Sequence, residues 1–250
     1  MDIDESMGGL AKGIAIAECF DRERTRLTVT EAATLTGQSP AAARRCMRTL
    51  EAIGYLSYDG KFYRPTPRFA RFATAYTAVD PLPRLAEPLL DRLRERLDES
   101  ASVSVLDGDD VLFVARSEAH HLVATGQRVG ARLPVSLSAA GRVLLAGVAA
   151  GDREALVRGG IRGRMSPKAM SDPEAILAEV RAGRERGYCL TDEEVEIGLR
   201  AVAVPVTDAS GRIVAAMSAS ALSSRASVER MIAEFVPPLQ EGAAALGRML

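Results

Sequence analysis

The sequence predicts an α+β protein of two domains, and three observations predict it. The first part of the chain holds short helical segments separated by glycine and proline. The segment Asp80-Pro-Leu-Pro83 then places two prolines where neither a helix interior nor a central strand tolerates them. Beyond it, strands and helices alternate irregularly with hairpins, which favours an antiparallel sheet. We expect domains at residues 1–67 and 85–250, joined by a linker helix and hinge at 68–84.

The bulk properties are those of a folded globular protein. The 250 residues are 47% hydrophobic and 26% charged, which argues against extensive disorder. No apolar run approaches the roughly 18 residues that span a bilayer, and the acidic start Met1–Glu5 differs from a signal peptide, so we expect a cytoplasmic protein with no membrane partner. Cys19, Cys46 and Cys189 are too widely spaced to indicate a disulfide framework or a zinc site.

The N-terminal helices have the spacing of a helix-turn-helix. Apolar residues recur at helical spacing in Leu10–Phe20. Thr28 and Glu31 form a capping box, which begins a second helix that runs to about residue 36. Ser39–Ile53 forms the third, with serine as N-cap and proline at the first helical position. A turn of about three residues around Gly37 joins the last two, as a helix-turn-helix requires.

A hairpin and a connecting helix are expected next. The segment Tyr55–Arg64 forms two strands around Asp59-Gly60, a strong hairpin signal, and this hairpin is the wing of a winged helix-turn-helix. Residues 68–79 form the connecting helix. In the second domain we expect helices at 85–97, 139–149, 173–186 and 227–250, and strands within 102–115 (turning at 107–110), at 201–206 and at 213–220.

Basic residues concentrate in the third helix and the wing. Residues 41–72 hold seven basic and two acidic residues, a net charge of +5, so the rest of the chain carries −6 of the total of −1. On the third helix, Ala43, Cys46, Met47, Leu50 and Ile53 share a face that we expect to pack on the other two helices, which leaves the arginines pointing away. An exposed arginine can contact guanine or phosphate. The predicted DNA-binding residues are Ser39, Arg44, Arg45, Arg48, Lys61 and Arg64.

These residues also carry a family resemblance. The stretches Leu10–Ile16, Thr30–Ala33 and Ser39–Tyr55 resemble the start of IclR-family regulators. The second domain agrees, and from about Gly9 onward nearly the whole chain is covered. The Ala41–Arg45 run and the Leu106–Val111 hairpin look most like the branch that controls aromatic-acid breakdown. The matching segments of the second domain are 133–134, 138–146, 186–188, 192–194, 198–200 and 202–205.

The resemblance implies a GAF-like effector domain, a homodimer or homotetramer on pseudo-palindromic double-stranded operator DNA, and a small organic acid as effector. No cofactor is implied. One departure is Ala201, where many relatives carry Ser or Cys, so a polar contact is expected to be missing. The pocket of the family falls on Ser138, Ala139, Ala140, Gly141, Asp192, Glu194, Met217, Ser218 and Ser220.

Several side chains leave more than one interpretation open. Arg116, His120, Arg132 or Arg142 could supply a cation to an acid, or could simply lie on the surface. Asp192 and Glu194 could cap or pair with Arg200 instead of touching a ligand. His120 and His121 point to opposite faces if they lie in a strand, with no third ligand in view, so no metal site is expected.

Two other functions are open for the second domain. One is a domain that serves only oligomerisation. The other is an enzyme that uses Asp192, Glu193 and Glu194 for acid–base chemistry on a small acid. The sequence holds no GxSxG motif and no glycine-rich phosphate loop, so we expect no enzyme.

Overall fold

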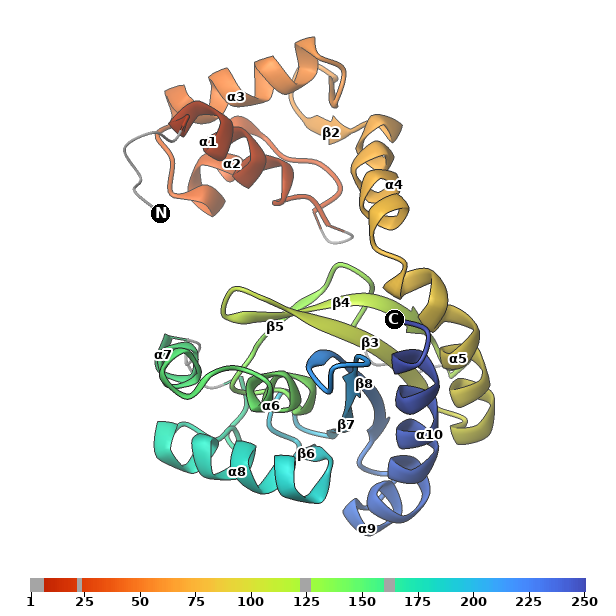
Figure 1. Ribbon diagram of the computed structural model, residues 1–250. Helices are drawn as coiled ribbons and strands as arrows, with labels where there is room; N and C mark the ends of the chain where they lie inside the picture. Colours follow the sequence, from red (N-terminus) through yellow and green to blue (C-terminus); the bar gives the residue numbers. More distant parts are fainter. Residues whose placement is uncertain (1–6, 22–23, 122–126, 160–164) are drawn as a thin grey trace. The chain divides into compact units, whose positions relative to one another are not determined.

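The computed structural model of the chain describes residues 7–21, 24–121, 127–159 and 165–250. These residues divide into two compact units, Met1–Val79 and Asp80–Leu250 (Figure 1). We call them the N-terminal unit and the C-terminal unit. The division lies at the two prolines that interrupt the sequence pattern.

Three helices and a hairpin make up the N-terminal unit. The helices are α1 (Gly8–Ala17), α2 (Val29–Thr36) and α3 (Pro40–Ala52). The capping box of α2 is formed as predicted, because Thr28 accepts a hydrogen bond from the Glu31 N–H and Glu31 accepts one from the Thr28 N–H. Gly37 follows in the left-handed conformation with φ of 65°, which lets the chain turn sharply into α3. The predicted helix-turn-helix is confirmed.

The predicted wing is also present. It consists of β1 (Leu56–Tyr58) and β2 (Tyr63–Pro65), which pair antiparallel. A 3₁₀ turn (Pro67–Phe69) and α4 (Ala70–Val79) follow. A small core of residues from all three helices and the wing holds the unit together. Its fully or nearly fully buried members are Ile16, Leu27, Ala32, Ala33, Ala43, Met47, Leu56 and Tyr63.

A six-stranded antiparallel sheet forms the centre of the C-terminal unit, in the order β5-β4-β3-β8-β7-β6. The hairpin of β3 (Ser100–Asp107) and β4 (Asp110–Ser117) turns at the predicted place, where Gly108 has a φ of 63°. The strands β7 (Leu199–Thr207) and β8 (Ile213–Leu222) were also predicted. The edge strands β5 (Arg132–Pro134) and β6 (Cys189–Asp192) were not.

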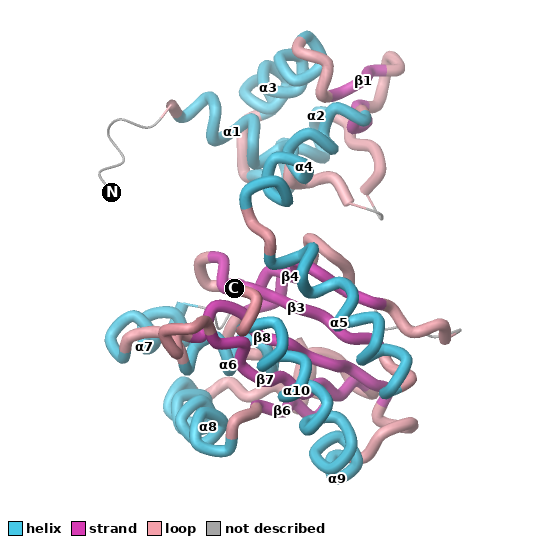
Figure 2. The backbone as a smooth tube through the Cα atoms, turned by 45° about the vertical axis from the view of Figure 1, so that its right-hand side comes forward, coloured by secondary structure: helices cyan, strands magenta, loops and turns pink. Residues whose placement is uncertain are grey.

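Helices cover both faces of this sheet. On one face lie α5 (Leu82–Leu97) and α10 (Val236–Gly247), which cross in front of the strands in Figure 2. On the other face lie α6 (Ala139–Ala146) and α8 (Pro173–Arg186), and α7 (Ala150–Gly159) contacts α8 (Figure 1). Successive strand residues point to opposite faces, so each strand contributes to two separate cores. The α+β prediction is confirmed.

The expected last helix is interrupted. Instead of one helix over 227–250, the chain forms a single turn α9 (Val228–Arg230), a π-helical segment at Met231–Phe235, and then α10. Pro237 and Pro238 lack the N–H that would bond to the preceding turn, so the regular helical ladder cannot continue through them. The π-helical segment ends just before this break.

Candidate functional site

Three arginines of α3 form an exposed basic face. Arg44, Arg45 and Arg48 are all exposed, while Ala43 and Met47 on the opposite side are fully buried. None of the three arginines forms a salt bridge with any residue that the structure describes. Ser39 caps the helix and accepts a hydrogen bond from the N–H of Ala42 at 3.3 Å. The face therefore offers guanidinium groups that are not neutralised within the N-terminal unit.

One residue of the expected packed face lies at the surface. Ile53 is 48% exposed, so the prediction that it packs on the other helices is wrong. Cys46 and Leu50 are only half-buried, because the core of the unit lies toward Ala43 and Met47. The side of α3 with Cys46, Leu50 and Ile53 instead lines an apolar groove, together with residues of α1 and the aromatic residues Tyr55, Phe69 and Phe72.

The wing carries the other two predicted DNA-binding side chains. Lys61 and Arg64 are exposed. Arg64 lies 3.5 Å from a carboxylate oxygen of Asp59, so its charge is partly offset. The Lys61 ammonium lies 5.0 Å from the centre of the Phe62 ring. Arg26 lies over the same ring at 4.2 Å, a residue that the sequence analysis did not single out.

In the C-terminal unit, a small cavity lies between the sheet and the start of α6. Of the predicted effector residues, Ser138, Ala139 and Ala140 line it from the helix, and Ser218 and Ser220 line it from β8. The described walls leave about 20 Å³ for the centre of a water molecule, which is roughly the space of one water. Ala201, the expected departure from relatives, also lines it, and the wall residues not expected from the sequence are Ser102, Phe113, Gln127, Leu133, Thr191, Val195 and Leu199.

The start of α6 approaches its neighbours closely. The Ser138 hydroxyl accepts a hydrogen bond from the N–H of Gly141 at 3.0 Å, so it serves as the N-cap. A side chain at Gly141 would collide with the backbone carbonyl of Val135, which explains the glycine. Gly141 therefore allows the helix to sit against the 135–138 segment, and it supports the cavity without lining it. The first N–H groups of a helix lack helical partners and favour an anion.

Arg116 is a predicted cation that hydrogen-bonds to a residue of the cavity wall. Its side chain is 2% exposed, and its Nη1 donates a hydrogen bond to the hydroxyl of the wall residue Ser102 at 2.8 Å. Burial lowers the pKa of Arg116, and the nearby carboxylate of Glu118 acts in the opposite direction. An arginine nevertheless stays protonated at neutral pH, because its ordinary pKa lies far above neutral. A positive charge is thus one hydrogen bond away from the cavity wall.

Glu194 and Arg142 form a buried ion pair. Nη1 of Arg142 donates to Oε1 of Glu194 at 2.8 Å, and Nη2 donates to Oε2 at 2.6 Å. Oε2 also accepts a bond from the N–H of Met170 at 3.1 Å. The carboxylate of Glu194 is held in this way and does not line the cavity as the structure describes it, so its contact with an effector stays a prediction. For the same reason Arg142 is not a free cation for an acid.

Asp192 follows the alternative interpretation. Its carboxylate accepts a hydrogen bond from Nε of Arg200 at 2.6 Å, and Arg200 also donates to the carbonyls of Ser223 and Ala226. Asp192 is therefore paired with Arg200, as the alternative interpretation expected, and its contact with the effector stays a prediction. Glu194, in contrast, pairs with Arg142 and not with Arg200.

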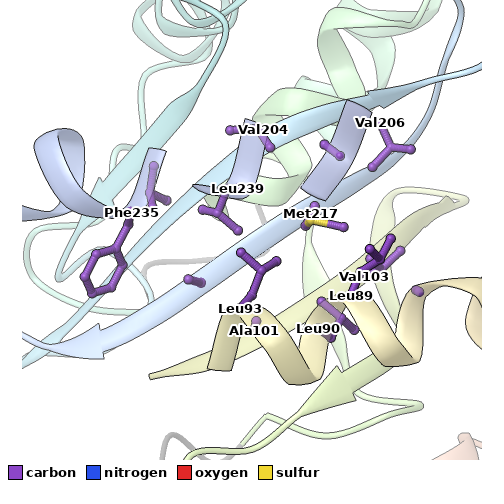
Figure 3. Close-up of a cluster of buried hydrophobic side chains, with 14 of the residues drawn as sticks. Leu89, Leu90, Leu93, Ala101, Val103, Val204, Val206, Met217, Phe235 and Leu239 are labelled. Carbon is purple, nitrogen blue, oxygen red and sulfur yellow. The ribbon is translucent and has the colours of Figure 1, made fainter. Parts of the chain in front are cut away.

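Met217 lies on the wrong face of the sheet for the predicted role. Its side chain is fully buried among Leu93, Leu239 and Val204, under α5 and α10 (Figure 3). Ser218, the next residue of β8, faces the cavity, and successive strand residues cannot share a face. Met217 therefore points away from this cavity, and its contact with the effector stays a prediction without support from the described geometry.

The remaining candidate cations lie elsewhere. His120 is exposed, and its Nε2 lies 2.8 Å from Nη1 of Arg94. Arg132 is paired with Asp107 at 2.8 Å and with Asp110 at 3.1 Å. Neither residue lines the cavity as far as the structure describes it, and the contact of His120 with the effector stays a prediction.

Comparisons with known proteins agree with this architecture. Residues 9–60 match the IclR helix-turn-helix domain, and residues 74–248 match the C-terminal domain of bacterial transcriptional regulator IclR. Within the described parts of the chain, no helix is long and apolar enough to cross a membrane.

Individual relatives match over most of their length. The chain is 37% identical to the Pca regulon regulatory protein of Pseudomonas putida over 235 residues, or 93% of this chain and 80% of that protein. It is 35% identical to the p-hydroxybenzoate hydroxylase transcriptional activator of Acinetobacter baylyi over 249 residues, which is 96% of this chain and 90% of that protein. A solved IclR homolog complexed with 4-hydroxybenzoate, from Microbacterium hydrocarbonoxydans, is 26% identical with a TM-score of 0.80. The match covers 96% of this chain and 98% of that one. The chain therefore belongs to the IclR family of bacterial transcriptional regulators, which bind DNA through a helix-turn-helix and are not enzymes.

Proposed function

We propose that the N-terminal unit reads operator DNA with α3 and the wing, and that a small aromatic acid bound in the C-terminal unit controls this binding. The observation that carries the proposal is the cavity at the start of α6, where hydroxyl groups and apolar side chains face one another. The DNA contacts are proposed for Ser39, Arg44, Arg45, Arg48, Lys61 and Arg64. The genes under control would serve aromatic-acid catabolism, and the protein would work in the cytoplasm.

The walls of the cavity suit a carboxylate attached to a ring. Hydroxyls from Ser102, Ser138 and Thr191 and the N-terminal end of α6 supply hydrogen bonds, and Arg116 supplies charge through Ser102. Phe113 and Leu133 supply apolar contacts for a ring. The relatives support the choice of acid, because one is an activator of p-hydroxybenzoate hydroxylase and one was solved with 4-hydroxybenzoate.

The small volume of the cavity has a mechanical consequence. An aromatic acid is much larger than the one water that the described walls admit. It can therefore enter only if a wall moves, and the free energy of binding then favours the conformation in which the walls are apart. This displacement is the step by which we propose that effector binding is transmitted to the rest of the chain.

We further propose that the chain acts as a homodimer or homotetramer on a pseudo-palindromic operator. Leu10, Ile14 and Phe72 of the apolar groove are between 42% and 63% exposed. Contiguous exposed apolar side chains of this kind are typical of surfaces that associate. A two-fold dimer would present two copies of α3 to two half-sites.

A thermal-shift titration tests the sensor function. The full chain is heated with each of a panel of aromatic acids, such as 4-hydroxybenzoate and protocatechuate, and short aliphatic acids as matched controls. An aromatic acid at 100 times its dissociation constant should stabilise the protein by about 2.7 kcal/mol, because it binds only the folded state. If no acid raises the melting temperature, the alternative holds, in which the C-terminal unit serves only oligomerisation.

A further inference from the structure

The ring of Phe62 on the wing holds two cations. The guanidinium of Arg26 lies 4.2 Å from the centre of the ring, and the ammonium of Lys61 lies 5.0 Å from it. Both distances are within the roughly 6 Å at which a ring attracts a cation. Arg26 is exposed, so its N–H groups remain accessible while Cζ of its guanidinium lies over the ring.

A backbone bridge fixes Arg26 at this position. Leu27 pairs antiparallel with Tyr63, through hydrogen bonds of 3.0 Å and 2.8 Å between their N–H and carbonyl groups. Both side chains of this pair are buried in the core of the unit. Because neighbouring residues of paired strands point to the other face, Arg26 and Phe62 share the outer surface of the wing. The segment before α2 thus pairs with β2 of the wing through a single antiparallel bridge.

The charges around Phe62 favour a polyanion. Continuing the register by one residue sets Arg26 across from Arg64, so two like charges lie next to each other, with Lys61 nearby. The nearby carboxylates offset only part of this charge. Asp59 accepts the N–H groups of Phe62 and Lys61, which lowers its pKa, and lies 3.5 Å from Arg64, while Glu31 accepts the N–H of Thr28. Arg26 itself forms no salt bridge with any described residue.

We infer that Arg26, held by Phe62 beside Lys61, contacts the phosphate backbone of the operator. This contact extends the proposed DNA-binding function, on which it rests, to a segment outside the helix-turn-helix. An arginine stacked on a ring has lost part of its conformational freedom before binding, and its planar N–H groups suit phosphate oxygens. Phe62 is a positioning residue that acts through Arg26 and Lys61.

The salt dependence of DNA binding measures this contact. The full chain is titrated into a fluorescently labelled duplex of mixed sequence, and the binding constant is followed from about 50 to 200 mM salt. Arg26→Gln should make the slope of log K against log salt less negative by about 0.9 for each copy bound, because one phosphate contact is lost. Arg26→Lys should keep the slope. Phe62→Leu should weaken DNA binding about two- to fivefold, because Arg26 and Lys61 lose the aromatic ring that holds them in place.

Arg24→Gln is the matched control. It removes the same charge from the same loop, but Arg24 is already paired with Asp21. Its slope should equal that of the wild type. An Arg26→Gln slope equal to the wild-type slope, or an equally large change in Arg24→Gln, would overturn the contact. A wild-type chain that does not bind the duplex even at the lowest salt would instead overturn the proposed DNA-binding function itself.

Discussion

At the scale of single residues, the pair of Arg142 and Glu194 is the most deeply buried salt bridge among the described residues. The Arg142 residue is only 1% exposed, and all its charge is balanced by one carboxylate. Removing one partner of a buried pair leaves the other charge desolvated and uncompensated. A surface pair gains little, since water screens both charges. The two kinds of pair in this chain should therefore respond very differently to the same substitution.

Glu194→Gln should lower the free energy of unfolding by about 3 to 5 kcal/mol, measured by urea denaturation followed by circular dichroism. Glu241→Gln is the matched control. Glu241 pairs with Arg96 at 2.6 Å, but both side chains are more than half exposed. The control should cost less than about 1 kcal/mol. Equal losses for the two variants would contradict the structural role of Glu194.

Arg48→Ala should weaken specific operator binding by about 1 to 3 kcal/mol, because a guanidinium that contacts a base edge would be lost. The operator is first selected from random duplexes with the wild-type chain, and affinity is then measured at fixed salt by gel shift. Unchanged affinity would remove Arg48 from the DNA-binding residues. A loss that is equal on all sequences would assign it to phosphate, not to base recognition.

Single residues were predicted well where a local pattern decides their position. The arginines of α3 follow from helical spacing. The positions of Met217 and Glu194 outside the cavity wall did not follow from the family resemblance. The alternation of Met217 and Ser218 along β8 indicates in the sequence that their side chains lie on opposite faces. The partner of Glu194 lies 52 positions away, and no local pattern indicates such a contact.

At the scale of elements, α6 and its close approach to the 135–138 segment hold the cavity. All residues of α6 are buried, and a side chain at Gly141 would collide with the Val135 carbonyl. The helix would have to move away from the segment to admit even one methyl group. Any such movement would displace Ser138, Ala139 and Ala140, which line the cavity.

Gly141→Ala should therefore destabilise the protein by about 1 to 3 kcal/mol and weaken effector binding. Gly151→Ala is the control, because Gly151 also lies in a helix but has open space around it. That substitution should be neutral or slightly stabilising, since alanine favours a helix. Thermal melting with and without the acid identified in the panel measures both effects. A Gly141→Ala variant as stable as Gly151→Ala would contradict the packing described for α6.

Elements with strong local signals were predicted, and elements that depend on distant pairing were not. The capping box of α2 and the turns at 59–60 and 107–110 are determined by residues that are neighbours in the sequence. The strands β5 and β6 contain only three and four residues, and each is defined by its partner at an edge of the sheet. Their short segments show no periodic pattern by which they could be found.

For the whole molecule, the basic segment and the cavity lie in different units. The net charge of −1 conceals a segment of +5 that includes α3 and the wing. The cavity lies in the other unit, between a six-stranded sheet and α6. An effector can change DNA binding only by the difference in its affinity for the two conformations, and such coupling typically amounts to about 5- to 150-fold.

The most direct test of the account is operator affinity of the full chain with and without the saturating aromatic acid. We expect a change of about 5- to 150-fold in the wild-type protein. We expect no change in Ala201→Val, because the added methyl groups fill the cavity on the face of β7 between Thr191 and Ser220. An operator affinity that no acid alters, or a response that persists unchanged in Ala201→Val, would contradict control through this cavity.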